Sequence, residues 1–197
     1  MGERSTGTAT RIVEAARACL LADGFAALST RRVADAAGVP LSQIHYHFGG
    51  KQGVVLALLE HENRRLVGRQ RRMYGTEEPL WKRYEQACDF LDDDLASGYV
   101  RVLQEMIAAG WSDRAVAREV LGLLQAWFEV LQEVAGEAER KLGGLGPFTA
   151  GDVAALIGVA FLGGESMILL GDPDWGDRVR AALRRFGAAI RALEEAS

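Results

Sequence analysis

The chain has 197 residues, a formal net charge of −4 and a hydrophobic content of 49%, ordinary values for a soluble globular protein that can bury a core. Its polar N-terminus lacks the apolar segment of a secretion signal. The longest apolar run, residues 153–164, is too short to span a bilayer. We therefore expect a cytoplasmic protein with no membrane partner. The two cysteines, Cys19 and Cys88, belong to no metal-binding spacing and favour buried thiols.

The charge is unevenly distributed along the chain. Residues 1–72 contain 11 Lys/Arg and 6 Asp/Glu, a balance of +5, whereas residues 73–197 contain 12 and 21, a balance of −9. A basic N-terminal segment joined to an acidic remainder is typical of a nucleic-acid-binding domain attached to a domain that does not bind nucleic acid.

Helical periodicity predicts an all-α protein of about nine helices, with no strand pattern and no internal repeat. The first helix is expected over about residues 10–23, a second between Ser29 as N-cap and Gly38 as terminator, and a third over about 41–48. The remaining helices are expected over about 51–73, 79–98, 99–109, 112–141, 149–170 and from 173 almost to the end. Residues 112–141 fit either one helix or two with a break near Gly122.

Ala34, Gly38 and Ile44 have the spacing of a helix-turn-helix. The first residue must be small because the second helix crosses close to it, and the glycine tolerates a left-handed turn. The third must be a buried aliphatic side chain that holds the second helix against the first. Val33, Val39 and Phe48 are expected to complete the surrounding core.

The opposite side of the short third helix is polar and aromatic. It carries Leu41, Ser42, His45 and Tyr46, and it is the side that the major groove of DNA would receive. His45 and His47 do not suit a metal site, because residues two apart on a helix diverge by about 200°. The sequence also offers neither histidine a nucleophile or an orienting carboxylate. We expect no catalytic residue, metal or cofactor, and no enzymatic activity.

Residues from about Thr10 to Glu60 resemble the DNA-binding domain of TetR-family transcriptional regulators of the TetR/AcrR type. The resemblance is carried by "RIVEAARACLLADGF", "LSTRRVADAAGV", "IHYHF" and the lysine three residues after Phe48. It implies a three-helix helix-turn-helix domain at residues 1–52, with a long linking helix from about residue 51. It also implies a helical-bundle domain for effector binding and dimerisation at residues 53–197.

The resemblance implies DNA-binding roles for nine residues. Thr30 falls where the family places a phosphate-contacting hydroxyl, and Arg31 where some members read a guanine. The groove-facing positions are held by Leu41, Ser42, Gln43 and His45, and the phosphate-contacting positions by Tyr46, His47 and Lys51. Leu41 is apolar where polar residues are frequent, and Gly50 replaces the usual capping residue before the long helix.

Aromatic and acidic residues in the remaining two-thirds are candidates for a ligand pocket. They are Trp81, Tyr84, Phe90, Glu105, Trp111, Trp127, Phe128 and Glu165. Ordinary core packing explains most of the aromatic residues as well, and the two glutamates are equally compatible with exposure or with arginine pairing. Both readings stay open from the sequence.

The segment "GVAFLGGESMILL" combines small and large apolar residues. Gly158, Ala160, Gly163 and Gly164 allow close helix approach, so that this helix and residues 175–193 can form a four-helix dimer interface. An internal buried helix is the alternative. The family resemblance favours the homodimer.

We therefore expect a homodimeric DNA-binding regulator, most simply a repressor that leaves a pseudo-palindromic double-stranded operator when it binds a small-molecule effector. Activation of transcription, or repression without a ligand, remains open within the same fold. A different class also remains open, in which a small helical enzyme or ligand-sequestering protein keeps a vestigial DNA-binding motif.

Overall fold

The computed structural model describes residues 2–196, except for the side chains of residues 2–6, 25 and 26. Within that range the chain forms nine helices and no strand, which confirms the all-α prediction. The helices are α1 (Gly2–Ala27), α2 (Thr30–Ala37), α3 (Leu41–Phe48), α4 (Lys51–Tyr74), α5 (Leu80–Ala96), α6 (Tyr99–Gly110), α7 (Arg114–Leu142), α8 (Ala150–Leu169) and α9 (Pro173–Ala196).

Two helices differ from the sequence prediction. The first begins at Gly2, well before residue 10, and contains a kink at Gly24, which has φ 78° and ψ 170°. The seventh is continuous across Gly122. A single exposed glycine costs a helix only about 1 kcal/mol, which the other residues of this long helix offset.

The chain divides into two compact units. The N-terminal unit comprises residues up to Arg64 together with Ser97–Val120, and the C-terminal unit comprises Arg65–Ala96 and the chain from Leu121 onward. Helices α4 and α7 therefore each contribute residues to both units. The functional division expected after residue 52 concerns which residues bind DNA, and it stays a prediction.

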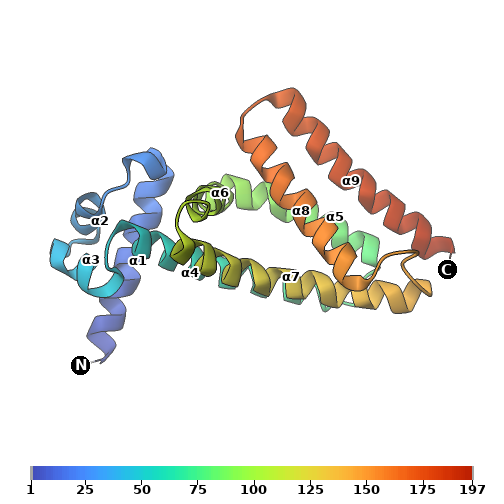
Figure 1. Cartoon of the computed structure of the whole chain (residues 1–197), viewed down its shortest axis with the longest axis horizontal. Coiled ribbons are helices and arrows are strands. Elements are labelled where there is room, and N and C mark those ends of the chain that lie inside the picture. The colour runs from blue at the N-terminus through green and yellow to red at the C-terminus, as the bar shows by residue number, and fades with distance from the viewer. Residues whose placement is uncertain (1, 197) are drawn as a thin grey trace. The chain divides into compact units, whose positions relative to one another are not determined.

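The N-terminal unit is built around fully buried aliphatic side chains. Ile12 of α1, Ile44 of α3 and Val55 of α4 have no exposed surface, and Figure 1 shows α2 and α3 beside α1. The hydroxyl of Tyr99 on α6 donates to the buried Asn63 on α4 over 3.1 Å. Apolar burial and this internal hydrogen bond together join α6 to the unit.

The C-terminal unit contains α8 and α9 as an antiparallel pair (Figure 1). Glycines allow close packing here: a Cβ at Gly164 would lie 2.9 Å from a methyl of Val179, and one at Gly187 would lie 3.1 Å from the ring of Tyr84. A capping box begins α8, in which the Asp152 N–H donates to the Thr149 hydroxyl over 3.1 Å and the carboxylate of Asp152 accepts from the backbone of Thr149. This confirms the expected start of α8.

A buried arginine joins three segments of the C-terminal unit. The side chain of Arg83 on α5 is 2% exposed and forms an ion pair with Glu137 on α7. It also donates to the backbone carbonyl of Tyr74 at the end of α4. Glu137 accepts a second cation, Lys141, over 2.7 Å. Side-chain hydrogen bonds from Arg83 lower the pKa of Glu137 from 4.5 to about 2, although partial burial opposes the shift.

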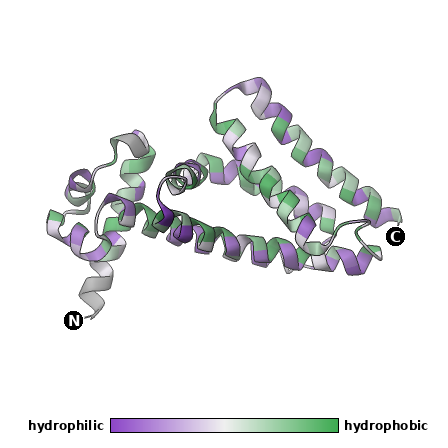
Figure 2. Ribbon diagram, in the orientation of Figure 1, coloured by the Kyte–Doolittle hydropathy of each residue, from purple (hydrophilic) through white to green (hydrophobic). Residues whose placement is uncertain are grey.

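Helix α8 is unusually apolar. Its 20 residues would be long and apolar enough to cross a bilayer by length and composition, and only 28% of its most apolar window is buried within the chain. Figure 2 shows hydrophobic residues along much of this helix. The core helix of a soluble protein meets the same test of length and composition, and less than a third of the apolar window of α8 is buried within this single chain.

Candidate nucleic-acid interface

The turn between α2 and α3 has the geometry that the sequence predicted. The Ser29 hydroxyl accepts from the backbone N–H of Arg32 over 3.2 Å and thereby caps α2. Gly38 ends the helix in the left-handed region, with φ 63° and ψ 41°. The Val39 N–H then donates to the Ala34 carbonyl over 3.0 Å. This hydrogen bond satisfies an end carbonyl of α2 and fixes the direction in which the chain leaves.

The inner contacts of the motif follow the spacing rule, with two differences. Val33 and Ala34 are buried in α2, and Ile44 is buried in α3. Val39 and Phe48, also expected in the core, are only half-buried. Val39 lies in the turn and Phe48 is the last residue of α3, so each has packing partners on fewer sides than Ile44, which is central in its helix.

Gly53 fixes the approach of α3 to α4, a role that sequence reasoning missed. A Cβ at this position would lie 1.8 Å from the Phe48 carbonyl oxygen, a distance that no side chain can adopt. Gly49 ends α3 with φ 71° and donates its N–H to the His45 carbonyl over 3.0 Å. The segment Gly49-Gly50-Lys51-Gln52-Gly53 contained a signal, because glycine in the first turn of a helix has a poor propensity and needs a packing reason.

The outward side of α3 presents polar and aromatic groups to solvent. Ser42, His45 and Tyr46 are exposed, Tyr46 by 78%. Leu41 and Gln43 are half-buried. These five residues lie on or beside the surface that the sequence assigned to the DNA groove.

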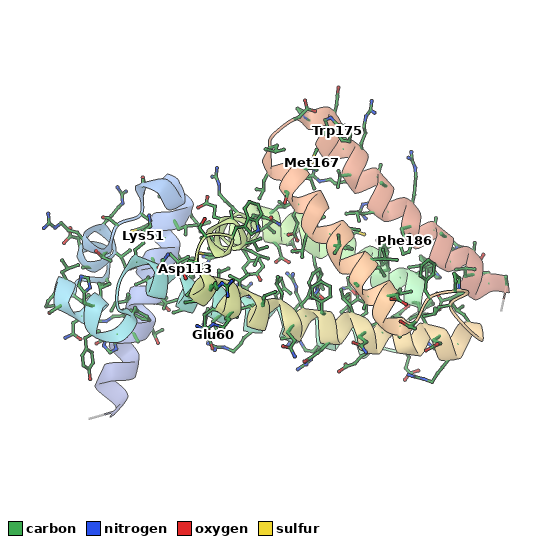
Figure 3. The ribbon with its side chains drawn as sticks, viewed as in Figure 1. Lys51, Glu60, Asp113, Met167, Trp175 and Phe186 are labelled. Atoms are coloured by element: carbon green, nitrogen blue, oxygen red, sulfur yellow. The ribbon has the colours of Figure 1, made fainter. Side chains whose placement is uncertain are left out.

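The four predicted phosphate contacts lie on three helices of the N-terminal unit: α2, α3 and α4. His47 is half-buried, and its ring meets that of Tyr46 edge to face at 5.0 Å between centroids. Thr30 is the first residue of α2 and is half-buried, with Arg31 exposed beside it. Lys51 is the first residue of α4 (Figure 3). The phenol, imidazole, hydroxyl and ammonium groups are all donors that suit phosphate oxygens.

Two of the candidate ligand residues, Glu105 and Trp111, belong to the N-terminal unit. Burial raises the pKa of Glu105, while the positive charges of Arg101 and Lys51 oppose that shift. Glu105 forms an ion pair with Arg101, one turn earlier on α6, over 3.8 Å. Trp111 is 83% exposed.

The other candidates lie in the C-terminal unit, where most have partners within the protein. The Trp127 indole N–H donates to the buried Gln70 side chain over 2.8 Å, and the Phe128 ring packs against Gly158. Phe90 is covered by the Arg69 guanidinium at 4.0 Å and Trp81 by that of Arg191 at 4.8 Å. Glu165 is buried in α8.

A cavity of about 470 Å³ lies in the C-terminal unit, and Tyr84 is the one candidate among the eight that lines it. Its other walls are mainly aliphatic residues and glycines that the sequence did not single out. The sequence offered little signal for this pocket, because a glycine-rich loop and small residues near the end of a helix do not by themselves indicate one.

Among the residues that the structure describes, no group of three or more His, Cys, Asp or Glu side chains is arranged to hold a metal ion.

The chain is similar in sequence to known regulators over its N-terminal part. Residues 12–58 match the family model of bacterial regulatory proteins, tetR family. The HTH-type transcriptional repressor AcnR of Corynebacterium glutamicum is 32% identical over 66 residues, which cover 34% of this chain and 35% of that protein. The matched part of the chain thus spans about a third of the length of this curated relative.

The likeness to solved structures extends over nearly the whole chain. A TetR-family transcriptional regulator from Pectobacterium atrosepticum superposes with a TM-score of 0.76 at 20% identity, over 98% of this chain and 97% of that one. A putative transcriptional regulator from Saccharomonospora viridis, solved with choline, gives 0.77 at 18% identity, over 92% and 95%. At these identities the likeness establishes the fold. Residues 12–58 therefore match the tetR family in sequence, and the chain as a whole shares the fold of the regulators named above.

Proposed function

We propose that the protein is a transcriptional regulator that binds DNA by placing α3 in the major groove. The observation that carries the proposal is the outward face of α3 inside the family-matching segment, where Ser42, His45 and Tyr46 are exposed while Ile44 is buried. A helix held by one buried face can offer the other face to base edges without unfolding. Such a protein acts in the cytoplasm, where bacterial DNA is.

The nine proposed DNA-binding residues fall into two groups by their chemistry. The reading residues contact bases and the positioning residues contact phosphates. Ser42, Gln43 and His45 carry donors and acceptors that can distinguish base edges, and Leu41 can contact a thymine methyl. Arg31 has the fork geometry for a guanine. The other four, which suit phosphate, are Thr30, Tyr46, His47 and Lys51.

We propose that the regulator is a homodimer formed through α8 and α9. Leu156 and Val159 on α8 are 58% and 64% exposed, and Trp175 on α9 is 53% exposed; Figure 3 marks Trp175 near the start of α9. Exposed apolar groups on a paired set of helices favour burial against a second copy. Of the small residues expected at this interface, Ala160 and Gly163 are exposed.

The remaining two small residues serve packing within the chain. Gly158 and Gly164 are buried, against Phe128 and Val179 respectively. A dimer interface on α8 therefore uses the other side of the helix. Two copies joined there would carry two recognition helices to successive major grooves, about one helical turn (~34 Å) apart.

The dimer is tested by placing a charge on its proposed interface. Leu156→Glu should convert the dimer to a monomer and weaken operator binding at least tenfold, because a buried carboxylate lacks a partner there. The measurements are sedimentation velocity and a gel-shift titration. Leu121→Glu, at a 63% exposed position on α7, is the matched control and should remain dimeric. A dimeric Leu156→Glu protein would contradict the proposed interface.

We propose that the protein represses its target genes and that a small molecule relieves the repression. The AcnR relative is named a repressor, and the C-terminal unit contains a cavity large enough for a ligand. If ligand and operator favour different conformations, their binding is negatively coupled, typically by ~1–3 kcal/mol. Reporter expression with and without the gene, in the host, decides between repression and activation.

DNA binding itself is tested by selecting genomic fragments that the purified protein retains and sequencing them. We expect enriched upstream fragments with a pseudo-palindrome, whose binding weakens steeply between about 50 and 200 mM salt. His45→Ala should lose enrichment of the selected site, while His61→Ala, at an exposed position of α4 in the same unit, should retain it. A protein that retains no sequence preferentially at any salt in this range is not a DNA-binding regulator.

A further inference from the structure

The cavity of the C-terminal unit is lined by segments far apart in sequence. Its walls come from the end of α4, the beginning of α5, the C-terminal part of α7, the first turns of α8, the second half of α9 and the loop over residues 143–149. The volume of about 470 Å³ lies within the ~300–1,000 Å³ typical of small-molecule sites. An apolar space of this size inside a compact unit is suited to a ligand.

No charged side chain belongs to the cavity lining among the residues described. Two nearby carboxylates are committed to partners within the unit. Glu137 is paired with Arg83 and Lys141. Glu194, next to the lining residue Leu193, accepts the backbone N–H groups of Leu80 and Trp81, each over 2.9 Å. A charged ligand entering this pocket would lose part of its hydration and meet no counter-charge in the lining.

The polar side chains in the lining are two tyrosines, Tyr74 and Tyr84. The Tyr84 ring makes a tilted contact with Phe186 at 5.5 Å and an edge-to-face contact with Phe161 at 6.1 Å between centroids, and Figure 3 marks Phe186 on α9. Burial raises the pKa of both phenols, so they remain uncharged throughout the physiological pH range. A neutral phenol can exchange a hydrogen bond with a hydroxyl or carbonyl group.

We propose that this cavity binds an uncharged, largely apolar small molecule with a hydroxyl or carbonyl group, and that it excludes anions and cations of the same size. Describing that molecule as the effector rests on the proposed regulatory function; the binding itself does not. The aliphatic walls supply the affinity through apolar burial. The tyrosines supply the polar contact.

A quaternary ammonium ligand is the main rival, because aromatic rings attract such cations and the structurally similar protein from Saccharomonospora viridis was solved with choline. Four aromatic residues line the present cavity, namely Tyr74, Tyr84, Phe148 and Phe186. The rest of the wall is aliphatic or glycine, with no carboxylate to neutralise a cation. A ligand as small as choline would also leave much of the volume unfilled, which forfeits packing energy.

Three probes with the same alkyl chain separate these possibilities: decan-1-ol, decanoate and decyltrimethylammonium. The alcohol is kept below its solubility limit and the two charged probes below their critical micelle concentrations. Binding to the full chain is measured by displacement of the neutral dye Nile red and by calorimetry, with no DNA present. We expect decan-1-ol to bind at least tenfold more tightly than either charged probe. Equal or tighter binding of the anion or the cation overturns the proposal.

The site is located by filling the cavity. Ala138→Trp replaces a lining residue and should weaken decan-1-ol binding at least tenfold, whereas Ala115→Trp, at an exposed position of α7 outside this lining, should not. Val153→Trp, also in the lining, is the second variant if the first loses its helical circular dichroism. Undiminished binding by a folded lining variant overturns the proposal.

Failure of the proposed function is recognised separately, since operator binding is measured on the same protein without any probe. A protein that binds decan-1-ol selectively but no DNA supports the cavity assignment and refutes the regulator. A protein that binds its operator but binds decan-1-ol no more tightly than the two charged probes refutes the cavity assignment and leaves the regulator proposal standing.

Discussion

The two compact units carry their candidate sites in opposite ways. In the N-terminal unit, one short helix has a buried side that contains Ile44 and an outward side with Ser42, His45 and Tyr46. In the C-terminal unit the candidate site is a pocket lined by residues of five helices and a loop. The first arrangement is local, so sequence spacing can specify it. The second depends on how distant segments pack.

Glycine positions give the sharpest test of this contrast. Gly53→Ala should destabilise the N-terminal unit by roughly 3 kcal/mol, because its Cβ would lie 1.8 Å from the backbone oxygen of Phe48. Gly122→Ala, at an exposed position of α7 with no atom within 4 Å of the new Cβ, should stabilise the protein by about 0.5–1 kcal/mol.

Urea unfolding followed by circular dichroism measures both changes. Equal unfolding free energies of the Gly53→Ala and Gly122→Ala proteins would contradict this prediction. They would show that the junction between α3 and α4 can accept a side chain at residue 53.

The buried ion pair tests what holds the C-terminal unit together. Arg83→Met should cost about 2 kcal/mol at pH 7, because it leaves Glu137 and the Tyr74 carbonyl without their buried donor. The pKa of Glu137 is lowered from 4.5 to about 2 in the folded protein, so its pairing stabilises the fold fully above pH 4.5. That contribution is lost as the pH falls from about 4.5 toward 2.

The stability difference between wild type and Arg83→Met should therefore shrink between pH 7 and pH 3 in urea titrations. Arg184→Met is the matched control, since this exposed arginine pairs with the exposed Asp89 on the surface; its effect should be small at both pH values. A pH-independent effect of Arg83→Met would show that the pair does not respond to the ionisation of Glu137.

On the DNA-binding side, the division between reading and positioning residues predicts two different responses. His45→Ala should change the preference at one operator position by about 1–3 kcal/mol. Lys51→Ala should weaken binding to all sequences about equally and lower the salt slope by roughly one unit. Gel-shift titrations over operator variants and salt concentrations measure both. Identical behaviour of the two variants would refute the division.

The smallest effect is expected from a cap that only the tertiary structure provides. Glu194 accepts the N–H groups of Leu80 and Trp81 at the beginning of α5, so Glu194→Ala should cost about 1 kcal/mol. Thermal unfolding measures the loss. Glu195→Ala, which removes a neighbouring surface pair with Arg191, should leave the melting temperature unchanged; an equal loss in both variants would mean that the cap contributes nothing.

The sequence predicts some structural features of these regions and misses others, for a physical reason. The caps at Ser29, Gly38 and Thr149 were predictable, because a cap is formed by residues within about one turn of each other. The burial of Ile44 was predictable for the same reason, from a spacing within one motif. At Gly53 the sequence signalled only that a glycine near the start of a helix needs a packing reason. The atom that it approaches was not predictable, since that depends on where the carbonyl of Phe48 is directed after two glycines.

The aromatic side chains of the C-terminal unit show that composition can suggest pocket residues without identifying which of them line the pocket. Trp127 has the composition expected of a pocket residue, yet its indole is satisfied by Gln70, 57 positions earlier in the chain. Tyr84 lines the cavity because Phe186 and Phe161 hold its ring from α9 and α8. Composition identifies both residues as candidates but cannot distinguish them, because the distinction is made by neighbours far along the chain.

The sequence by itself determined the helical class, the limits of most helices and the inner and outer sides of α3, since each follows from periodicity and capping over a few residues. Tertiary structure alone decided that Gly158 and Gly164 pack within the chain, that Glu194 caps α5, and that an uncharged cavity lies between α4, α5, α7, α8 and α9. These features arise from contacts between residues tens of positions apart, and a local pattern contains no information about which of them meet.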